Sequence, residues 1–226
     1  YCIVSDAERQ LLQSVPRPIV LLKKLPDCLI SESVAPNNNY LGVMLPYSPL
    51  HYLLMDNSLL ALVMTSGNIS EEPIAIDNDE ARCRLADLAD YFLIHDRDIR
   101  MRCDDSVAQV RQGHQTMLRR SRGYAPYPVD LDFSMKEILA CGPELKNTFC
   151  LTKDNHAFIS HHIGDLQNIE AYEYYCDSIE YYKKLFRIEP EIVACDLHPE
   201  YLSTKYALLG ADAPSTLTQR FLMDCC

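Results

Sequence analysis

The sequence predicts an α/β protein made of two successive domains. Short runs rich in Ile, Val and Leu alternate with amphipathic stretches, which is the pattern of alternating strands and helices. The pattern breaks between 125 and 135, where Pro126 and Pro128 precede two spaced aspartates. At 226 residues the chain can hold two modest cores, and we expect domains over 1–128 and 135–226.

The first half reads as strands and helices separated by polar turns. Its strands are short apolar runs, and its helices begin at capping residues, Ser48 followed by Pro49 in one case and Asp77 in the other. In chain order we expect a strand at 18–23, a helix at 49–55, a strand at 59–64, a helix at 77–88, and strands at 91–94 and 107–110.

The second half reads as a β-meander followed by a long helix. Apolar runs flank two turn sequences, Cys-Gly-Pro and Lys-Asp-Asn, and aromatic residues then recur at spacings of three and four. We expect strands at 138–140, 148–152 and 157–160, turns at 141–143 and 153–155, a helix at 169–186, and a strand at 192–195 that ends at Asp196.

Composition excludes several classes of protein. A formal net charge of -11 argues against broad binding to nucleic acid, which requires a surplus of Lys and Arg. No apolar run is long enough for a membrane span, and the first ten residues do not resemble an export signal. The 10 cysteines form no CxxC pair, so reduced thiols in a cytoplasmic protein are expected.

The stretch Thr65-Ser66-Gly67-Asn68 follows a predicted strand. Two hydroxyl groups, a glycine that permits close backbone approach and an amide suit a phosphate or nucleotide. Loops at strand ends hold ligands in open α/β sheets, although a plain turn has the same composition.

A basic segment follows further on. Arg119, Arg120 and Arg122 surround Ser121 with fork-shaped donors that match phosphate or carboxylate, and the alternative is a solvated basic edge. Upstream, Asp104-Asp105-Ser106 lies after several arginines, so either a Mg²⁺ site or mutual ion pairing fits.

The second half also carries polar clusters at strand ends. His161-His162-Ile163-Gly164-Asp165 has two imidazoles and a carboxylate, as proton transfer or metal binding requires, but adjacent histidines on a strand face opposite ways. Asp196 and His198 follow another predicted strand and are further candidates.

Several long strings resemble one family. KLPDCLISESVAPNNNYLGVMLPYSPLHYLL, LVMTSGNISEEPI, FLIHDRDIRMRCDDSV and RRSRGYAPYPV resemble the later part of the YrdC-like domain of HypF carbamoyltransferases. ILACGPELKNTFCLTKDNHAFISHHIGDLQN and VACDLHPEYLSTKYA resemble the opening of the actin-like domain that follows it. The resemblance implies the C-terminal part of a twisted YrdC-like α/β sheet, followed by the first part of an actin-like (ASKHA) α/β domain.

The resemblance also implies an activity. The family uses ATP, with Mg²⁺ expected, and carbamoyl phosphate to form carbamoyl-adenylate and pyrophosphate. The carbamoyl group then passes to the C-terminal cysteine of a HypE-type partner, in the maturation of [NiFe]-hydrogenase. Enclosed sites would protect the fragile mixed anhydride from water.

Site residues follow from the matching positions. In the first domain the implied nucleotide and phosphate residues are Thr65, Ser66, Gly67, Asn68, Ser106, Arg119, Arg120 and Arg122. Arg17 matches a residue that precedes a proline in the sheet. In the second domain the implied candidates are Glu144, Lys146, Asn147, His161, His162 and Asp165, without a division between chemistry and positioning.

The chain departs from the family at both ends. The acylphosphatase-like, zinc-finger and early Lys/Arg segments do not occur, the zinc and second-domain metal sites lie outside the chain, and the pattern is lost after Ala207. We therefore expect a truncated chain that is incomplete as an enzyme on its own, exposes apolar surface and self-associates. Two alternatives stay open: an enzyme like tRNA threonylcarbamoyl-adenylate synthase, and a nonenzymatic nucleotide-binding or docking remnant.

Overall fold

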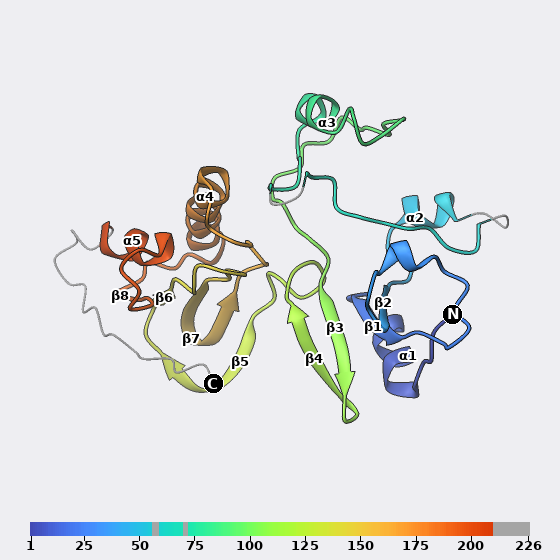
Figure 1. Cartoon of the computed structure of the whole chain (residues 1–226). Coiled ribbons are helices and arrows are strands. Elements are labelled where there is room, and N and C mark those ends of the chain that lie inside the picture. Colours follow the sequence, from blue (N-terminus) through green and yellow to red (C-terminus); the bar gives the residue numbers. More distant parts are fainter. Residues whose placement is uncertain (56–58, 70–71, 210–226) are drawn as a thin grey trace. The chain divides into compact units, whose positions relative to one another are not determined.

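The computed structural model describes residues 1–55, 59–69 and 72–209. Its contacts divide the chain into two compact units (Figure 1): residues 1–66 with 104–124, and residues 67–103 with 125–226. Each unit contains a four-stranded sheet, which confirms the α/β class. The segment 67–103 therefore interrupts the first unit in the sequence but belongs to the second unit.

The first unit is built on a sheet of order β2-β1-β3-β4. Strand β1 runs antiparallel to β2 and parallel to β3, and β3 and β4 form an antiparallel pair. The predicted strand at 18–23, the strand at 107–110 and the helix at 49–55 are confirmed within one residue. The elements are α1 (Asp6–Gln13), β1 (Ile19–Lys23), the 3₁₀ helix η1 (Glu32–Val34), β2 (Tyr40–Val43), α2 (Pro49–Leu54), β3 (Val107–Arg111) and β4 (His114–Arg119).

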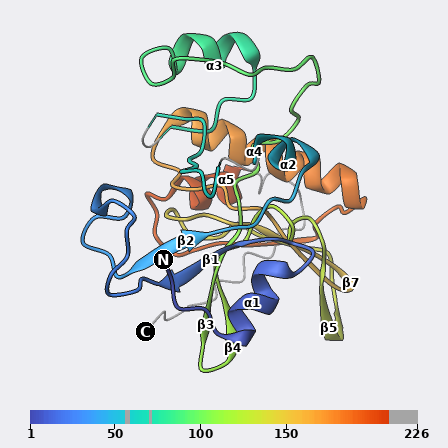
Figure 2. The ribbon, with the colours of Figure 1, turned by 90° about the vertical axis from the view of Figure 1, so that its right-hand side faces the viewer.

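Helix α1 supplies the cover for this sheet (Figure 2). Ser5 and Glu8 form a capping box that satisfies free amides at its start. Leu11 and Leu12 then pack with buried side chains of β1 and β3. The sequence pattern had not indicated this helix, which is only 8 residues long.

Two predicted strands are wrong. The runs 59–64 and 91–94 are neither strand nor buried: Leu60 is 78% exposed, Val63 76% and Tyr91 93%. Apolar composition yields a strand only where neighbouring strands accept its backbone hydrogen bonds. Neither sheet of the described residues includes these runs. The helix predicted at 77–88 is α3 (Asn78–Arg84), capped by Asp77 and followed by a turn.

The second unit is built on a sheet of order β5-β7-β6-β8. Strand β6 pairs antiparallel with β7 and parallel with β8, and β5 is an edge strand paired with β7. Strand β5 occupies the second half of 125–135, where the sequence shows no regular apolar pattern. Most of its side chains are exposed, which explains why the pattern is weak there. The elements are β5 (Val129–Met135), β6 (Ile138–Ala140), β7 (Cys150–Ile159), α4 (Ile169–Phe186), β8 (Ile192–Ala194) and α5 (Leu202–Leu209).

The chain reverses direction within β7. Asp154 has a positive φ of 52°, and the amide of Ser160 donates to the carbonyl of Phe149 at 2.8 Å. An extended run of this length would hold its ends about 30 Å apart, so this bond requires a reversal at Asp154. The predicted hairpin turn at 153–155 is thereby confirmed.

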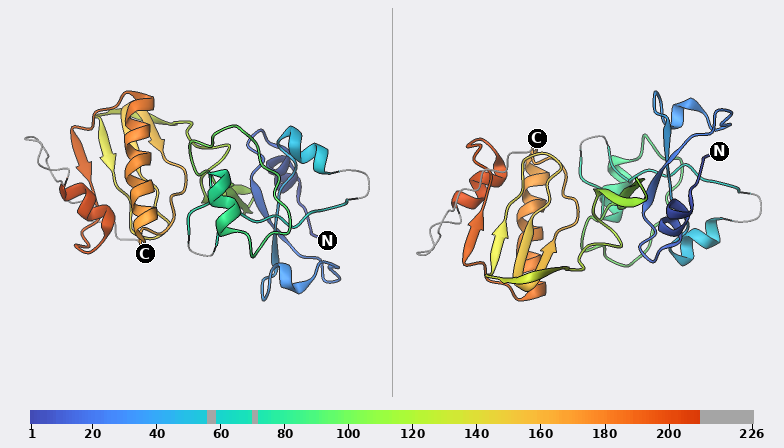
Figure 3. Two further views of the ribbon diagram at one scale, coloured as in Figure 1. Left: turned by 90° about the horizontal axis from the view of Figure 1, so that it is seen from above. Right: turned by 90° about the horizontal axis from the view of Figure 1, so that it is seen from below.

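Helix α4 covers one face of this sheet (Figure 3). It has the predicted bounds, is capped by Asn168, and ends at Arg187 in the left-handed conformation. Tyr175 and Tyr182 meet Phe149 edge to face at 6.1 and 5.1 Å between ring centroids. No helix among the described residues has the length and apolarity to cross a membrane.

We predict that Gly142→Ala strongly destabilises the second unit. Gly142 has a φ of 70°, and a Cβ atom there would lie 2.2 Å from the carbonyl oxygen of Thr148. Strain alone costs about 1–3 kcal/mol, and the backbone clash adds to it. The control is Gly164→Ala, where φ is 104° but nothing lies within 4 Å of the added atom. Equal urea midpoints for the two variants would contradict the prediction.

Candidate functional site

Arg122 joins four segments of the first unit. Its Nε donates to Asp105 Oδ1 at 2.6 Å, and its two terminal nitrogens donate to the carbonyls of Pro16 (3.0 Å) and Arg17 (2.9 Å). The guanidinium also lies 3.4 Å from the ring centroid of Tyr47. Because every guanidinium nitrogen of Arg122 is already hydrogen-bonded, Arg122 holds the surrounding segments in place and has no unused nitrogen for a ligand.

Ser106 binds the same segment from the interior of the first unit. It is fully buried; its hydroxyl donates to the carbonyl of Arg122 at 2.9 Å and accepts from the amide of Ser121 at 2.8 Å. The predicted phosphate residue Ser106 therefore fixes the basic segment against β3. A direct contact with a ligand would require these bonds to break.

Ion pairs occupy the acidic dipeptide before β3. Arg119 pairs with Asp104, and Arg122 pairs with Asp105. Burial raises the pKa of the Asp104 carboxyl, the charge of Arg119 opposes this shift, and Asp105 adds to it. The ion-pairing alternative thus accounts for both aspartates. Across the described ranges no group of three His, Cys, Asp or Glu side chains is arranged for a metal ion.

Arg17 offers the cation that Arg122 does not. Arg17 has a positive φ of 47°, lies between two prolines, and its carbonyl is held by Arg122. Its half-buried guanidinium makes no hydrogen bond or ion pair with another described residue. The backbone of Arg17 is held in place and its guanidinium donors are not used by other described residues, which suits the binding of an anion.

The predicted nucleotide loop is exposed at its start and internally bonded at its end. Thr65, Ser66 and Gly67 are exposed, whereas Asn68 is half-buried. The side-chain amide of Asn68 donates to the carbonyls of Ile69 (3.0 Å) and Glu72 (2.9 Å). Its donors therefore shape the loop, and its carbonyl oxygen is what it can offer to a ligand. The amide of Ala75 closes the loop by donating to the carbonyl of Gly67 at 3.0 Å.

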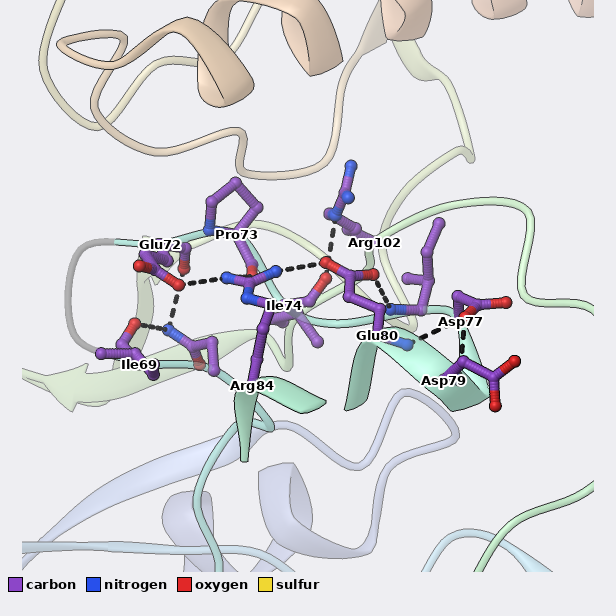
Figure 4. Close-up of polar contacts among 11 residues, drawn as sticks. Ile69, Glu72, Pro73, Ile74, Asp77, Asp79, Glu80, Arg84 and Arg102 are labelled. Carbon is purple, nitrogen blue, oxygen red and sulfur yellow. Dashed lines mark hydrogen bonds and ion pairs between the residues drawn. The ribbon is translucent and has the colours of Figure 1, made fainter. Parts of the chain in front are cut away.

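Two arginines support this loop (Figure 4). Arg84 of α3 pairs with Glu72 and Glu80 and donates to the carbonyl of Pro73. Arg102 donates through Nε to the carbonyl of Ile74 at 2.8 Å. The sequence reasoning did not assign these two supporting roles, because the partners lie 11 to 28 residues away.

The structure brings most second-domain candidates together. The amide of Asn147 donates to the carbonyl of Gly164 at 2.8 Å, and the amide of Lys146 donates to Asp165 Oδ1 at 2.7 Å. Asn147 is fully buried, and its side chain donates to the carbonyls of Cys141 and Pro143. Two loops, 141–147 and 162–166, are thus joined, and Lys146 carries an exposed ammonium group there.

Glu144 belongs to the same loop pair but faces a different element. Its carbonyl accepts from Leu166 at 3.0 Å, and its carboxylate accepts from the amide of Leu202 at 2.7 Å. The carboxylate thereby caps the first turn of α5. The structure gives Glu144 a structural contact.

The two adjacent histidines have different environments. His161 is fully buried beside Tyr174 and Tyr182 of α4, whereas His162 is half-buried. Burial, with a smaller contribution from His162, lowers the pKa of His161 to about 4. Its Nε2 lies 2.6 Å from the Tyr174 hydroxyl, and its buried Nδ1 has no hydrogen-bond partner among the described atoms.

Tyr174 is the site residue that sequence reasoning missed. The aromatic stripe of α4 was read from Tyr172, Tyr175 and Tyr182, and Tyr174 lies at its edge. A tyrosine at the edge of an apolar stripe carries a polar group that seeks a partner, which is the available signal. Asp196 and His198 are exposed; Asp196 caps the amide of His198 at 3.1 Å.

Family models match both parts of the chain. The Sua5/YciO/YrdC model, described as "Telomere recombination", matches residues 1–121. The model of the HypF Kae1-like domain matches residues 134–219. Together they confirm the expected pair of domain types.

Curated relatives match across nearly the whole chain. Carbamoyltransferase HypF of Synechocystis sp. is 44% identical over 90% of this chain, and that of Rhizobium leguminosarum bv. viciae is 43% identical over 96%. The chain spans only 27% and 29% of the length of these two proteins.

Solved structures give the same result. A crystal structure of full-length HypF in the phosphate- and nucleotide-bound form has a TM-score of 0.88 and 52% identity, covering 98% of this chain and 34% of that one. HypF of T. kodakarensis has a TM-score of 0.91 and 36% identity, covering 97% and 29% respectively.

Arg122→Lys is predicted to destabilise the first unit by about 2–3 kcal/mol, because a lysine cannot reproduce the fork and leaves carbonyls and Asp105 without donors. Arg111→Lys, on an exposed arginine of β3, is the control and should change stability by less than about 0.5 kcal/mol. Urea unfolding followed by far-ultraviolet circular dichroism measures both. Equal costs would contradict the structural role of Arg122.

His161 should make stability depend on pH. The unfolded chain protonates this residue near pH 6.5, while the folded chain resists protonation until about pH 4. Stability is therefore full above about pH 6.5 and falls, by roughly 3 kcal/mol, as the pH drops toward 4. His161→Gln keeps a donor for Tyr174 but does not titrate. Unfolding at several pH values from 7.5 to 4.5 should show a shallower slope for the variant, and parallel slopes would refute this.

Proposed function

Because this chain belongs to the HypF carbamoyltransferase family, we propose that it carries out part of an ATP-dependent carbamoyl transfer. Water hydrolyses carbamoyl phosphate to carbamate and inorganic phosphate. A carbamate oxygen then attacks the α-phosphorus of ATP; pyrophosphate leaves and carbamoyl-adenylate forms. The second domain then directs the carbamoyl group to the C-terminal cysteine of a HypE-type maturation protein, and AMP leaves. The single observation that carries the proposal is the order of the two domain types in one chain.

The relatives support a nucleotide and a phosphate as ligands. The related HypF structure that covers 98% of this chain is described as phosphate- and nucleotide-bound. Mg²⁺ would accompany the triphosphate, because Mg²⁺ binds largely through substrate phosphates and one or two carboxylates. Asp104 and Asp105 are the carboxylates beside the basic segment, and they would have to exchange Arg119 and Arg122 for the ion.

Roles in the first domain follow from which groups are still available. The guanidinium of Arg17 has no partner among the described side chains. We therefore assign Arg17 the role of stabilising the negative charge that develops on the phosphates. Ser66, which is exposed, would contact the nucleotide in the first unit. Asn68, which belongs to the second unit, would offer its carbonyl oxygen to a nucleotide. Arg119, Arg122 and Ser106 would hold the frame around it.

Roles in the second domain follow from the joined loops. Lys146 is exposed and has a positive φ of 50°, and its backbone amide donates to Asp165. A cation at such a turn can bind the phosphate of the incoming adenylate. The buried Asn147 would hold the shape of this turn through its two carbonyl contacts.

A synthase of threonylcarbamoyl-adenylate is the second candidate, since the model that matches residues 1–121 includes Sua5 and YrdC. The match of residues 134–219 to the HypF domain favours the first candidate. The net charge of -11 also opposes a surface for tRNA.

The proposal is tested by carbamoyl-phosphate-dependent exchange of labelled pyrophosphate into ATP, measured on the purified chain. We expect exchange in the native chain, its loss in a Ser66→Ala, Asn68→Ala double variant, and a reduction of about 10²-fold or more in Arg17→Gln. Arg111→Gln, which also removes an arginine of the first unit, is the control and should retain exchange.

The alternatives predict different results. Exchange that requires threonine and bicarbonate instead of carbamoyl phosphate would establish the synthase activity. Binding of ATP without any exchange would establish a nonenzymatic nucleotide-binding module in place of the proposed enzyme.

A further inference from the structure

A path of hydrogen bonds runs from the Gly67–Asn68 loop to His161. The carbonyl of Gly67 accepts from the amide of Ala75 at 3.0 Å. The preceding carbonyl, of Ile74, accepts from Arg102 Nε at 2.8 Å (Figure 4). The carbonyl of Arg102 in turn accepts from the Tyr174 hydroxyl at 2.5 Å, and that hydroxyl lies 2.6 Å from His161 Nε2.

The direction of each bond at Tyr174 can be deduced. A carbonyl oxygen only accepts, so the single phenolic proton of Tyr174 must go to the carbonyl of Arg102. The remaining contact, with His161, requires the imidazole to donate from Nε2. His161 is therefore held as the neutral Nε2–H tautomer, and its Nδ1 is left as an acceptor.

Packing makes the same connection independently. Met101 packs against the core that Tyr175, Tyr182 and Phe149 form in the second unit. The guanidinium of Arg102 lies 5.1 Å from the centroid of the Tyr174 ring. The segment that supports the loop is therefore attached to α4 by three kinds of contact: a hydrogen bond, a cation–π contact and apolar packing.

We propose that Tyr174 is a positioning residue that couples the Gly67–Asn68 loop to His161, because its hydroxyl group completes the hydrogen-bonded path between them. A change in the loop that moves Ile74 displaces Arg102, which alters the acceptor of Tyr174 and hence its contact with His161. The inference rests on the proposed function only for the identity of the ligand of the loop, a nucleotide. It deepens that function by linking the adenylate-forming loop to a residue of the transfer domain.

The first test needs no nucleotide. In the Tyr174→Phe variant of the full chain, ¹⁵N spectra of the histidine rings should show that His161 changes from one Nε2–H tautomer to a mixture. Hydrogen exchange at the amide of Ala75 should become about fivefold faster, the effect of one lost hydrogen bond. Both changes are required, and the absence of either overturns the coupling.

Two further variants separate this role from a general loss of structure. Tyr182→Phe also removes a hydroxyl that contacts His161, but at its backbone amide (3.3 Å), so the tautomer and the Ala75 exchange rate should stay unchanged. Arg102→Gln removes the bond to Ile74 but keeps the backbone carbonyl that binds Tyr174. It should speed exchange at Ala75, because Arg102 no longer holds Ile74, and leave His161 in the Nε2–H tautomer; an unchanged exchange rate at Ala75 overturns the proposed path.

A second test adds ATP with Mg²⁺. If the amides of Gly67 and Asn68 shift, the ring nitrogens of His161 should shift in the native chain and stay fixed in Tyr174→Phe; a shift confined to the loop overturns the coupling. If ATP shifts neither loop amide, the proposed nucleotide function of the loop fails. The nucleotide-free results for Tyr174→Phe and Arg102→Gln then still decide the coupling.

Discussion

The first unit depends on the guanidinium of Arg122. This one planar group contacts the segments before β1, before α2 and before β3, through Pro16 and Arg17, Tyr47 and Asp105 respectively. Its fixed geometry is what lysine lacks. Because Arg122 holds two carbonyls at the entrance to β1, it also determines where Arg17 is presented. The candidate anion site is thus positioned by an arginine that need not touch the anion.

Elements with local signals were predictable from the sequence. Caps at Ser48, Asp77 and Asn168 set the beginnings of α2, α3 and α4, and the aromatic stripe fixed α4 to its last residue. The chain reversal at Asp154 was predicted from the sequence Lys-Asp-Asn, which favours a turn, although the reversal lies within β7. In each case the sequence signal comes from residues within a few positions of one another.

Features that depend on distant partners were not predictable. The runs 59–64 and 91–94 have the composition of buried strands, yet pairing decides whether a strand forms. For β5 the reverse holds, since an exposed edge strand has no apolar signature. The arginines show the same limit: nothing local distinguishes Arg122, with its nitrogens engaged across up to 106 residues, from Arg17, whose side chain is unused among the described residues.

The histidine pair shows how one motif can divide its roles. Both residues lie just after β7, where His161 is buried beside α4 and His162 is half-buried. A buried imidazole is tolerated when it is neutral and at least one nitrogen is bonded, and Tyr174 provides that bond. Since His161 is fully buried, we propose that it acts through its hydrogen bond with Tyr174 rather than by touching a substrate.

The same reasoning explains how an acidic chain can bind an anion. Net charge governs long-range attraction, but binding at a site depends on cations whose charge is not already neutralised. Arg84, Arg119 and Arg122 are each paired with carboxylates, so they add little attraction of their own. The side chains of Arg17 and Lys146, by contrast, form no ion pair with another described residue, although Asp165 accepts from the backbone amide of Lys146. In a chain with a net charge of -11, Arg17 and Lys146 are therefore the side chains that we propose for binding phosphate.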